Sequence, residues 1–260
     1  MTASPFYKFE NEGALAIITI TRPEVMNSLH PAGHRAMDEA FNRFRDDDSL
    51  YVAILTGQGD KSFCAGSDLK TLSNDEDHDK PQTGFGGITN RTDLFKPVIA
   101  AINGYCLGGG LEMVAACDLA VASKTAKFGL PETRVGLAAT GGGLLQRLPR
   151  QVPMKDAMWL ILTGATIDAD KALSMHLINK VVDPEDVLKS AKEMAHQILE
   201  CAPLGVQASK QVVLQSLSEP DLEKAINANY EAVNRMMSSK DAIEGPRAFS
   251  EKRKPVWLGK

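Results

Sequence analysis

Four short apolar runs in the first half of the chain constrain its fold more than any other feature. They span residues 14–21, 51–56, 97–102 and 118–122, are rich in β-branched residues or alanine, and the first three are followed by Arg-Pro, Gly or Asn-Gly. Continuous apolar runs of this length indicate strands that are covered on both faces, as in parallel sheets. Between the first two runs, residues 31–46 carry apolar side chains at helical spacing. The sequence therefore predicts an α/β fold.

The second half of the chain changes to helical patterns. Helix starts are indicated at Asp168, Asp183-Pro184 and Pro220-Asp221. The expected helices cover residues 141–149, 154–163, 168–175, 184–200, 203–217, 219–238 and 240–250. A strand-rich core followed by a helical final third requires no second catalytic domain, so we expect that third to serve packing or assembly.

The amino-acid composition argues against several classes of protein. The 260 residues include 33 acidic and 29 basic side chains, and 43% of the chain is hydrophobic, which excludes a disordered chain. A net charge of −4 argues against an obligate nucleic-acid binder. The four cysteines form no CxxC pair and are expected to be small buried hydrophobes in a reducing compartment. With no signal-peptide pattern and no apolar run near the ~18 residues of a membrane span, we expect a soluble cytoplasmic protein.

Residues 73–87 are charged and then glycine-rich, with almost nothing to bury. This pattern predicts a solvated mobile loop, with a lid over a nearby site as the functional alternative. Three alternating aspartates imitate an EF-hand, but Lys80 and Gly86 occupy the positions that require glycine and glutamate. His30 and His34 are four apart, yet the proline between them disfavours helical geometry at His30. We therefore expect no metal site.

A glycine cluster lies in residues 103–112, NGYCLGGGLE, after a predicted strand. It is neither GxGxxG nor a P-loop, because the third glycine and the Lys-Ser/Thr pair are missing, and the run at 141–143 also lacks the lysine. If Gly109 or Gly110 opens a helix, its free N–H lies at the positive end of the helix dipole and could stabilise an oxyanion. Close packing is an equal alternative at this point.

A second glycine turn occurs in residues 62–70, SFCAGSDLK, after the second apolar run. Gly66 at a strand exit can present the next N–H, that of Ser67. The Ser67 hydroxyl has no GxSxG elbow around it and no histidine placed for a triad, which argues against a nucleophilic role.

Two carboxylates lie among apolar and glycine neighbours. Glu112 follows the first glycine cluster in GGGLEMVAAC, and Glu132 lies in FGLPE. Such carboxylates are either partnered structurally or used for proton transfer, where burial raises the pKa toward the working pH. Two acids that face one pocket could activate a water and protonate a carbon.

Together these segments carry a family resemblance. NGYCLGGGLE, SFCAGSDLK, FGLPETRVG, the opening RPEVMNSL and the late AFSEKRKP occur in order between residues 14 and 255. The sequence resembles the enoyl-CoA hydratase/isomerase (crotonase) family, most of all its enoyl-CoA hydratases. The resemblance implies a spiral of ββα units in residues 1–200 and a helical region at 201–260 that assembles a homotrimer or a dimer of trimers. It also implies an acyl-CoA thioester substrate and no cofactor, since the CoA is part of that substrate.

The resemblance assigns roles to individual residues. The N–H groups of Ser67 and Gly109 would form an oxyanion hole for the thioester carbonyl. Glu112 and Glu132 match the two glutamates of hydratases, with Glu112 our choice for the base and Glu132 for the acid. Further CoA contacts are expected from Ala65, Asp68, Leu69 and Lys70. Phe249 and Lys252, near the C-terminus, are expected to contact the CoA of a neighbouring subunit.

Two departures from the family pattern bear on the substrate. The usual Pro-Gly-x-Gly-Gly-Thr run reads AATGGGLL at 138–145, and Ser67 replaces a commoner alanine. The sequence predicts reversible hydration of a trans-2-enoyl-CoA to a 3-hydroxyacyl-CoA. The alternatives are a Δ3,Δ2-enoyl-CoA isomerase, or a binding protein of this fold with vestigial catalysis, for example one that binds RNA. The acyl chain, the division of labour between the glutamates and the choice between trimer and hexamer stay open.

Overall fold

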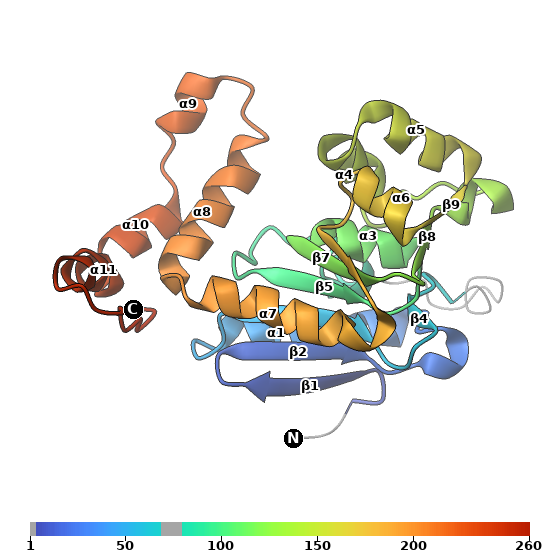
Figure 1. The fold of residues 1–260 in the computed structure, drawn as a ribbon. Helices are drawn as coiled ribbons and strands as arrows, with labels where there is room; N and C mark the ends of the chain where they lie inside the picture. Colours follow the sequence, from blue (N-terminus) through green and yellow to red (C-terminus); the bar gives the residue numbers. More distant parts are fainter. Residues whose placement is uncertain (1–3, 69–79) are drawn as a thin grey trace.

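The computed structural model describes residues 4–68 and 80–260, and two sheets form its core (Figure 1). The larger sheet has six strands in the order β1-β2-β3-β5-β7-β10. Only β1 and β2 in this sheet pair antiparallel. Its strands are β1 (Tyr7–Glu12), β2 (Leu15–Ile20), β3 (Val52–Gly57), β5 (Val98–Ile102), β7 (Leu119–Ser123) and β10 (Lys180–Val182).

The smaller sheet has four strands in the order β4-β6-β8-β9. They are β4 (Ser62–Cys64), β6 (Tyr105–Leu107), β8 (Lys127–Gly129) and β9 (Thr166–Asp168). Strands β3, β5 and β7 of the large sheet are each followed by β4, β6 and β8 of the small sheet. The chain therefore winds repeatedly between two sheets, which confirms the predicted α/β spiral and places the loops after β4, β6 and β8 side by side.

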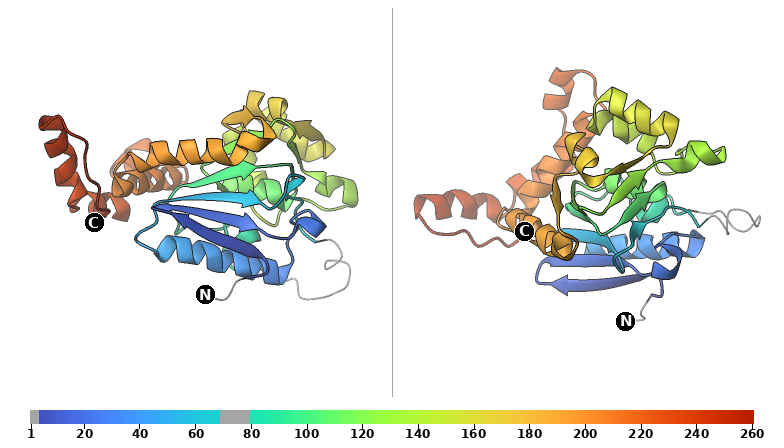
Figure 2. Two further views of the ribbon diagram at one scale, coloured as in Figure 1. Left: turned by 60° about the horizontal axis from the view of Figure 1, so that its bottom comes forward. Right: turned by 45° about the vertical axis from the view of Figure 1, so that its right-hand side comes forward.

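The helices lie around and beyond these sheets (Figures 1 and 2). The longer α-helices are α1 (Pro31–Asp46), α3 (Gly109–Ala116), α4 (Leu144–Gln151), α5 (Met154–Thr163), α7 (Val187–Leu199), α8 (Pro203–Ser216) and α11 (Asp241–Ser250). The short ones are α6 (Ala169–Ser174), α9 (Leu222–Ile226), α10 (Glu231–Met237) and the 3-10 helices η1 (Pro23–Val25), η2 (Phe85–Gly87), η3 (Pro131–Val135) and η4 (Pro184–Asp186).

The central strands are buried on both faces. Leu55 and Ala100 belong to a large core cluster with Phe41 of α1, whereas Ile54 and Ile99 pack on the other face with residues of α7. Both sets of side chains are buried because α1 covers one face of the sheet and α7 the other. This arrangement explains the continuous apolar runs and confirms the prediction drawn from them.

Two predicted helix boundaries are wrong. The helix predicted at 219–238 is two helices, α9 and α10. At the end of α9, the Asn227 side-chain amide donates to the Glu223 carbonyl at 2.8 Å. The Tyr230 hydroxyl donates to the Ala225 carbonyl at 2.7 Å, so these carbonyls are satisfied without a continuing helix. The helix predicted from 141 begins at Leu144, since the preceding glycine run remains non-helical.

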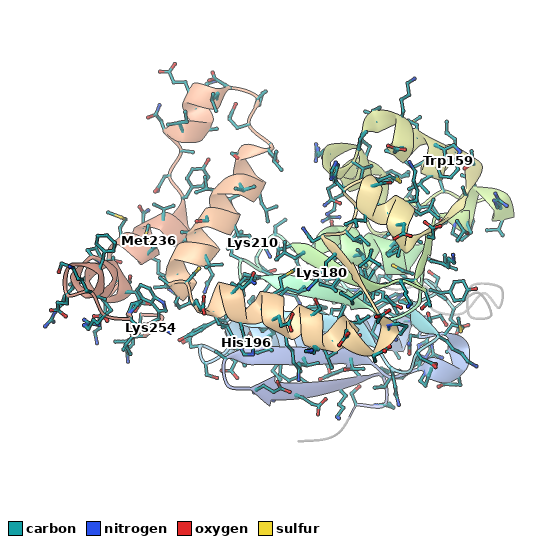
Figure 3. The ribbon with its side chains drawn as sticks, viewed as in Figure 1. Trp159, Lys180, His196, Lys210, Met236 and Lys254 are labelled. Carbon is teal, nitrogen blue, oxygen red and sulfur yellow. The ribbon has the colours of Figure 1, made fainter. Side chains whose placement is uncertain are left out.

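The C-terminal helices α8–α11 extend away from the two sheets (Figure 2). Lys210 on α8, labelled in Figure 3, ties this region to the core through a 2.7 Å ion pair with Asp118 before β7. Many large apolar side chains of these helices are exposed, namely Val213, Leu214, Leu217, Leu222, Ile226, Met237, Ile243 and Phe249. The boundary at residue 200 and the oligomeric assembly stay predictions.

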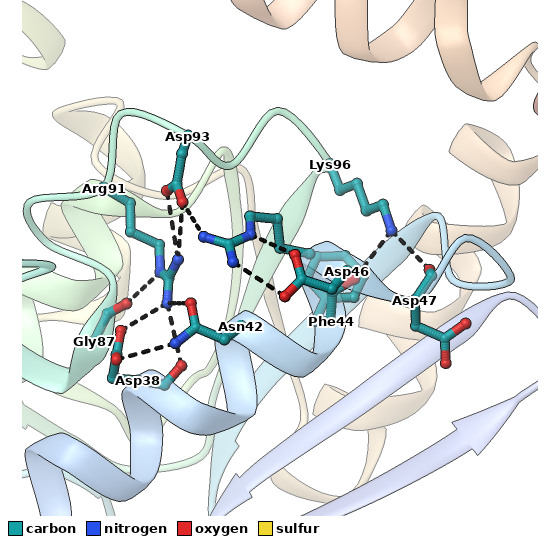
Figure 4. A network of polar contacts seen from close by, with 10 residues as sticks. Asp38, Asn42, Phe44, Asp46, Asp47, Gly87, Arg91, Asp93 and Lys96 are labelled. Atoms are coloured by element: carbon teal, nitrogen blue, oxygen red, sulfur yellow. Dashed lines mark hydrogen bonds and ion pairs between the residues drawn. The ribbon is translucent and has the colours of Figure 1, made fainter.

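A polar network ties the segment after η2 to α1 (Figure 4). The buried Arg91 guanidinium donates to the Asp38 carboxylate at 2.7 Å, the Asn42 side-chain oxygen at 2.8 Å and the Gly87 carbonyl at 2.6 Å. Charge-assisted bonds of this kind are about twice as strong as neutral ones. They hold η2, which carries Phe85, against α1.

Three cysteines, Cys64, Cys106 and Cys117, are buried and free, as predicted. Cys201 is free but exposed, so the prediction of a buried position is wrong for it. It lies at the C-terminal end of α7, where the chain leaves the core. None of the helices in the described parts of the chain is long and apolar enough to cross a membrane.

Candidate active site

The loops that follow β4, β6 and β8 surround a cavity of about 660 Å³. Six of the residues predicted for the site line this cavity: Ala65, Ser67, Asp68, Gly109, Glu112 and Glu132. Segments that are far apart in the sequence therefore meet in one place, as the winding of the strands requires. Lys80, Phe85 and residues 135–141 complete much of the wall.

Ser67 presents its N–H toward the cavity side of its loop. The Gly66 carbonyl accepts from the Leu29 N–H at 2.9 Å, and the Asp68 N–H donates to the Leu29 carbonyl at 2.9 Å. In an extended segment successive N–H groups point to opposite sides. The Ser67 N–H therefore faces away from Leu29, and it has no backbone acceptor among the described residues.

Gly109 supplies the second N–H. It is the first residue of α3, so its N–H has no partner within the helix. Gly108 before it has φ +53° and ψ −123°, a conformation that essentially only glycine adopts. A Cβ added to Gly66 would lie 3.1 Å from the Gly109 nitrogen, so the two loops are in close contact. The Ser67 loop and the start of α3 thus approach each other closely, and both Ser67 and Gly109 line the cavity.

The RPEVMNSL segment holds the Ser67 loop in place. Arg22 donates to the Ser28 carbonyl at 2.6 Å and forms an ion pair with Asp68 at 3.2 Å. Asn27 is fully buried, and its amide donates to the Ser62 carbonyl at 2.7 Å while its oxygen accepts from the Arg22 N–H at 3.0 Å. This segment enters the sequence prediction only as a family signature, and its positioning role was missed.

Glu112 lies in the first turn of α3 and is buried. Burial raises the pKa of its carboxyl, an effect that the Gly142 N–H opposes and the charge of Glu132 reinforces. That N–H donates to Glu112 Oε1 at 2.8 Å, and Arg147 donates to the Gly142 carbonyl at 3.0 Å. Because a Cβ on Gly142 would lie 2.6 Å from Glu112 Oε2, this position needs glycine. Although residues 138–145 depart from the family pattern, Gly142 in this segment still holds the Glu112 carboxyl.

Glu132 lies at the start of η3, on the other side of the Gly108 turn. A Cβ on Gly108 would lie 2.8 Å from Glu132 Oε1, so the carboxyl packs directly over that glycine. Its Oε2 atom is buried and has no hydrogen-bond partner among the described residues. Burial raises the pKa of this carboxyl as well. An acid held in this way is suited to exchanging a proton with a bound molecule.

The expectation that residues 73–87 bury almost nothing is wrong at their C-terminal end, and residues 73–79 lie outside the described part of the chain. Phe85 is 1% exposed, because Gly86 and Gly87 at φ +58° and +66° turn the chain into the core. Its ring packs edge-on against buried His34, whose Nδ1 accepts from the Gly86 N–H at 3.1 Å. The aromatic residue within TGFGG was the available signal.

Comparison with known proteins shows the family of the chain. A family model described as enoyl-CoA hydratase/isomerase matches residues 10–260. The chain belongs to the enoyl-CoA hydratase/isomerase family. The chain is 42% identical over 254 residues to a carnitinyl-CoA dehydratase of Proteus mirabilis, covering 95% of this chain and 96% of the relative. The corresponding protein of Salmonella typhi is 41% identical over the same length and coverage.

Solved structures agree on the fold. An enoyl-CoA hydratase of Mycobacterium tuberculosis superposes with a TM-score of 0.92 at 37% identity, covering 99% of this chain and 100% of that structure. One from Bacillus anthracis gives 0.89 at 32% identity, covering 98% and 100%. Enzymes of this family act on acyl-CoA thioesters and typically need no cofactor beyond the CoA of the substrate. Residues 4–68 and 80–260 contain no group of three or more His, Cys, Asp or Glu placed to hold a metal ion.

Four further residues predicted to contact CoA do not line the described part of the cavity. Leu69 and Lys70 are outside the described residues. Phe249 on α11 is 87% exposed, and Lys252 follows the same helix; neither lines the cavity of its own chain. Their distance from the site is evident in Figure 1, where α11 and the β4 loop lie at opposite ends of the molecule.

Proposed function

We propose that the protein is an enoyl-CoA hydratase, which adds water reversibly across the 2,3 double bond of a trans-2-enoyl-CoA. The observation that carries this proposal is the presence of two carboxyls, Glu112 and Glu132, in one cavity with two backbone N–H groups. Family membership supports hydro-lyase chemistry in general, and the paired acids favour hydration over the other reactions considered.

The two N–H groups act on the thioester. The N–H groups of Ser67 and Gly109 would both donate to the thioester oxygen and withdraw electron density from the conjugated double bond. When water attacks C3, negative charge moves to that oxygen, and both donors stabilise it. One such donor contributes about 3–4 kcal/mol in other enzymes. The α3 dipole adds to the effect because Gly109 is its first residue.

The carboxyls move the protons. Glu112 takes a proton from water as its oxygen bonds to C3, and Glu132 delivers a proton to C2, which gives the 3-hydroxyacyl-CoA. Burial raises the pKa of both groups, so one can be protonated while the other is ionised. Because the charge of Glu132 raises the pKa of Glu112, the two titrate as a pair and either could start as the base.

The names of the two relatives reported above bear on the acyl group. Those relatives are called carnitinyl-CoA dehydratases, and a dehydratase runs the same hydration in reverse. At 42% identity the acyl specificity need not be shared. The proposal for this chain is therefore the reaction class, a 2-enoyl-CoA and its 3-hydroxy product.

Assembly and CoA binding follow from the same proposal. The exposed apolar side chains of α8–α11 would be buried between subunits of a trimer or a dimer of trimers. Phe249 and Lys252 would then contact the CoA of a neighbouring subunit, and Ala65 and Asp68 that of their own chain. A cytoplasmic location is part of this proposal.

A spectrophotometric screen of enoyl-CoAs tests the function. Hydration removes the absorbance of the conjugated thioester, and Glu112→Gln and Glu132→Gln should each lower kcat by orders of magnitude. Feeding a 3-enoyl-CoA separates the isomerase alternative, because migration of the double bond creates that absorbance. A salt-dependent RNA-binding titration tests the vestigial alternative. A chain that leaves all 2-enoyl-CoAs unchanged would refute the proposal.

A further inference from the structure

Among the described residues that line the cavity, Lys80 is the one cation, and the proposed chemistry does not use it. Lys80 lines the cavity with Phe85 and Gly141. Its Nζ atom is 5.7 Å from the centre of the Phe85 ring, and a Cβ added to Gly141 would lie 2.9 Å from it. The ammonium group is therefore between η2 and the 138–141 segment.

The charge of Lys80 is not neutralised at contact distance. Among the described residues no carboxylate lies within 4.0 Å of its Nζ atom, although its charge does lower the pKa of Glu112. Asp68, another acid that lines the cavity, is paired with Arg22. His34 beneath Phe85 is held neutral, since burial lowers its pKa to about 3. The ammonium thus has its donors available to a bound molecule.

The position of Lys80 bears on the acyl chain of the substrate beyond C3. With the thioester oxygen bound by Ser67 and Gly109 as proposed, C3 would lie at Glu112, where water would attack. The Glu112 carboxyl accepts from the Gly142 N–H at 2.8 Å. A Cβ added to the preceding residue, Gly141, would lie 2.9 Å from the Lys80 ammonium, so that ammonium lies near the segment that holds Glu112. Acyl atoms beyond C3 would then be able to extend toward Lys80.

We propose that Lys80 determines substrate specificity and selects 2-enoyl-CoAs whose acyl chain ends in a carboxylate. The inference rests on the proposed hydratase function. An ammonium–carboxylate hydrogen bond is charge-assisted, and such bonds are about twice as strong as neutral ones. A quaternary ammonium end would instead meet a like charge, and the Phe85 ring that could attract it already faces Lys80.

Binding of unreactive saturated thioesters tests this without catalysis. Calorimetry should compare 4-carboxybutanoyl-CoA with its neutral isostere 4-carbamoylbutanoyl-CoA, and 4-trimethylammoniobutanoyl-CoA with 5,5-dimethylhexanoyl-CoA. The wild type should bind the carboxylate about tenfold or more tightly than the amide, and the ammonium more weakly than its carbon isostere. Lys80→Met should bring both ratios close to one.

The control is Lys189→Met, which removes a lysine of α7 whose side chain is 72% exposed and outside the cavity. It should leave both ratios as in the wild type. Lys80→Gln is the second variant should Lys80→Met unfold, as judged by thermal melting. Equal carboxylate-to-amide ratios in wild type and the Lys80 variants would overturn the inference.

Hydration of crotonyl-CoA, which has no charged end, separates this inference from the proposed function. If crotonyl-CoA is hydrated but the charged thioesters bind without discrimination, the specificity inference fails and the function stands. If no 2-enoyl-CoA is hydrated while the charge ratios hold, the proposed function fails and Lys80 still selects the ligand.

Discussion

Replacing Gly109 by alanine should damage both stability and catalysis through one contact. Gly109 has an ordinary φ, so alanine is acceptable to its backbone, but the new Cβ would lie 2.4 Å from Cε2 and Cζ of Phe85. The ring or the start of α3 must then move by about 1 Å to restore van der Waals contact. Overpacking of this kind costs about 1–3 kcal/mol of unfolding free energy. Because Phe85 is held by His34 and the η2 turn, the start of α3 should yield.

Displacement of the Gly109 N–H removes one donor from the thioester oxygen. Loss of one such donor lowers kcat by about 10²–10³-fold in another enzyme. Gly109→Ala should therefore fold, with reduced stability by urea denaturation, and should lose at least tenfold in kcat on crotonyl-CoA. Gly205→Ala on α8 is the matched control: its Cβ meets Ala202 at an ordinary 3.7 Å, so kcat should not change.

A double-mutant cycle with Phe85→Ala tests whether the Phe85 ring causes the loss of stability in Gly109→Ala. Without the ring, Gly109→Ala should cost little further stability, which gives a coupling free energy of about 1–3 kcal/mol between the two positions. If Gly109→Ala costs the same in both backgrounds, the ring is not what excludes a side chain at this position, and our explanation of this glycine is wrong.

Further predictions concern charge and the C-terminus. Burial raises the pKa of Glu112 and Glu132 in the folded protein above its value in the unfolded chain. The folded protein therefore loses stability as the pH rises from the unfolded-state pKa to the folded-state pKa. Each Glu→Gln variant should gain more in melting temperature at pH 8 than at pH 5. His34 behaves oppositely: its pKa of about 3 means that stability falls as pH drops below about 6.5, and His34→Gln should flatten the unfolding free energy between pH 6.5 and 4. Ser67→Ala should keep near-wild-type kcat, since only the backbone N–H is used; a folded but inactive variant would give the hydroxyl a chemical role. Lys252→Ala should raise KM at low salt with little change in kcat, an effect that added salt removes; an unchanged KM at low salt would contradict the contact across subunits.

The strands and the position of Glu112 could be predicted because their signals are local. A continuous apolar run reports burial on both faces, and the GGGLE segment after a strand indicates a helix start with a carboxylate in its first turn. The boundary between α9 and α10 was missed because the break depends on single side-chain bonds of Asn227 and Tyr230.

The wall formed by Lys80 and Phe85 could not be predicted from local composition. Residues around them are charged or glycine, which favours a solvated loop, and their burial depends on distant partners. The ring of Phe85 is held between His34 of α1 and Gly109 of α3, and Arg91 ties the same segment to Asp38. Such contacts join parts of the chain that no periodic pattern relates.

In the proposed mechanism, Glu112, Glu132 and the two N–H groups add water across a 2-enoyl thioester. The most direct measurement is mass spectrometry of product formed from crotonyl-CoA in ¹⁸O-labelled D₂O. We predict one ¹⁸O at C3 and one deuterium bonded to C2, with neither label incorporated by the Glu112→Gln/Glu132→Gln double variant. Deuterium in a double-bond isomer that carries no ¹⁸O, or unchanged crotonyl-CoA with a folded wild-type enzyme, would contradict the account.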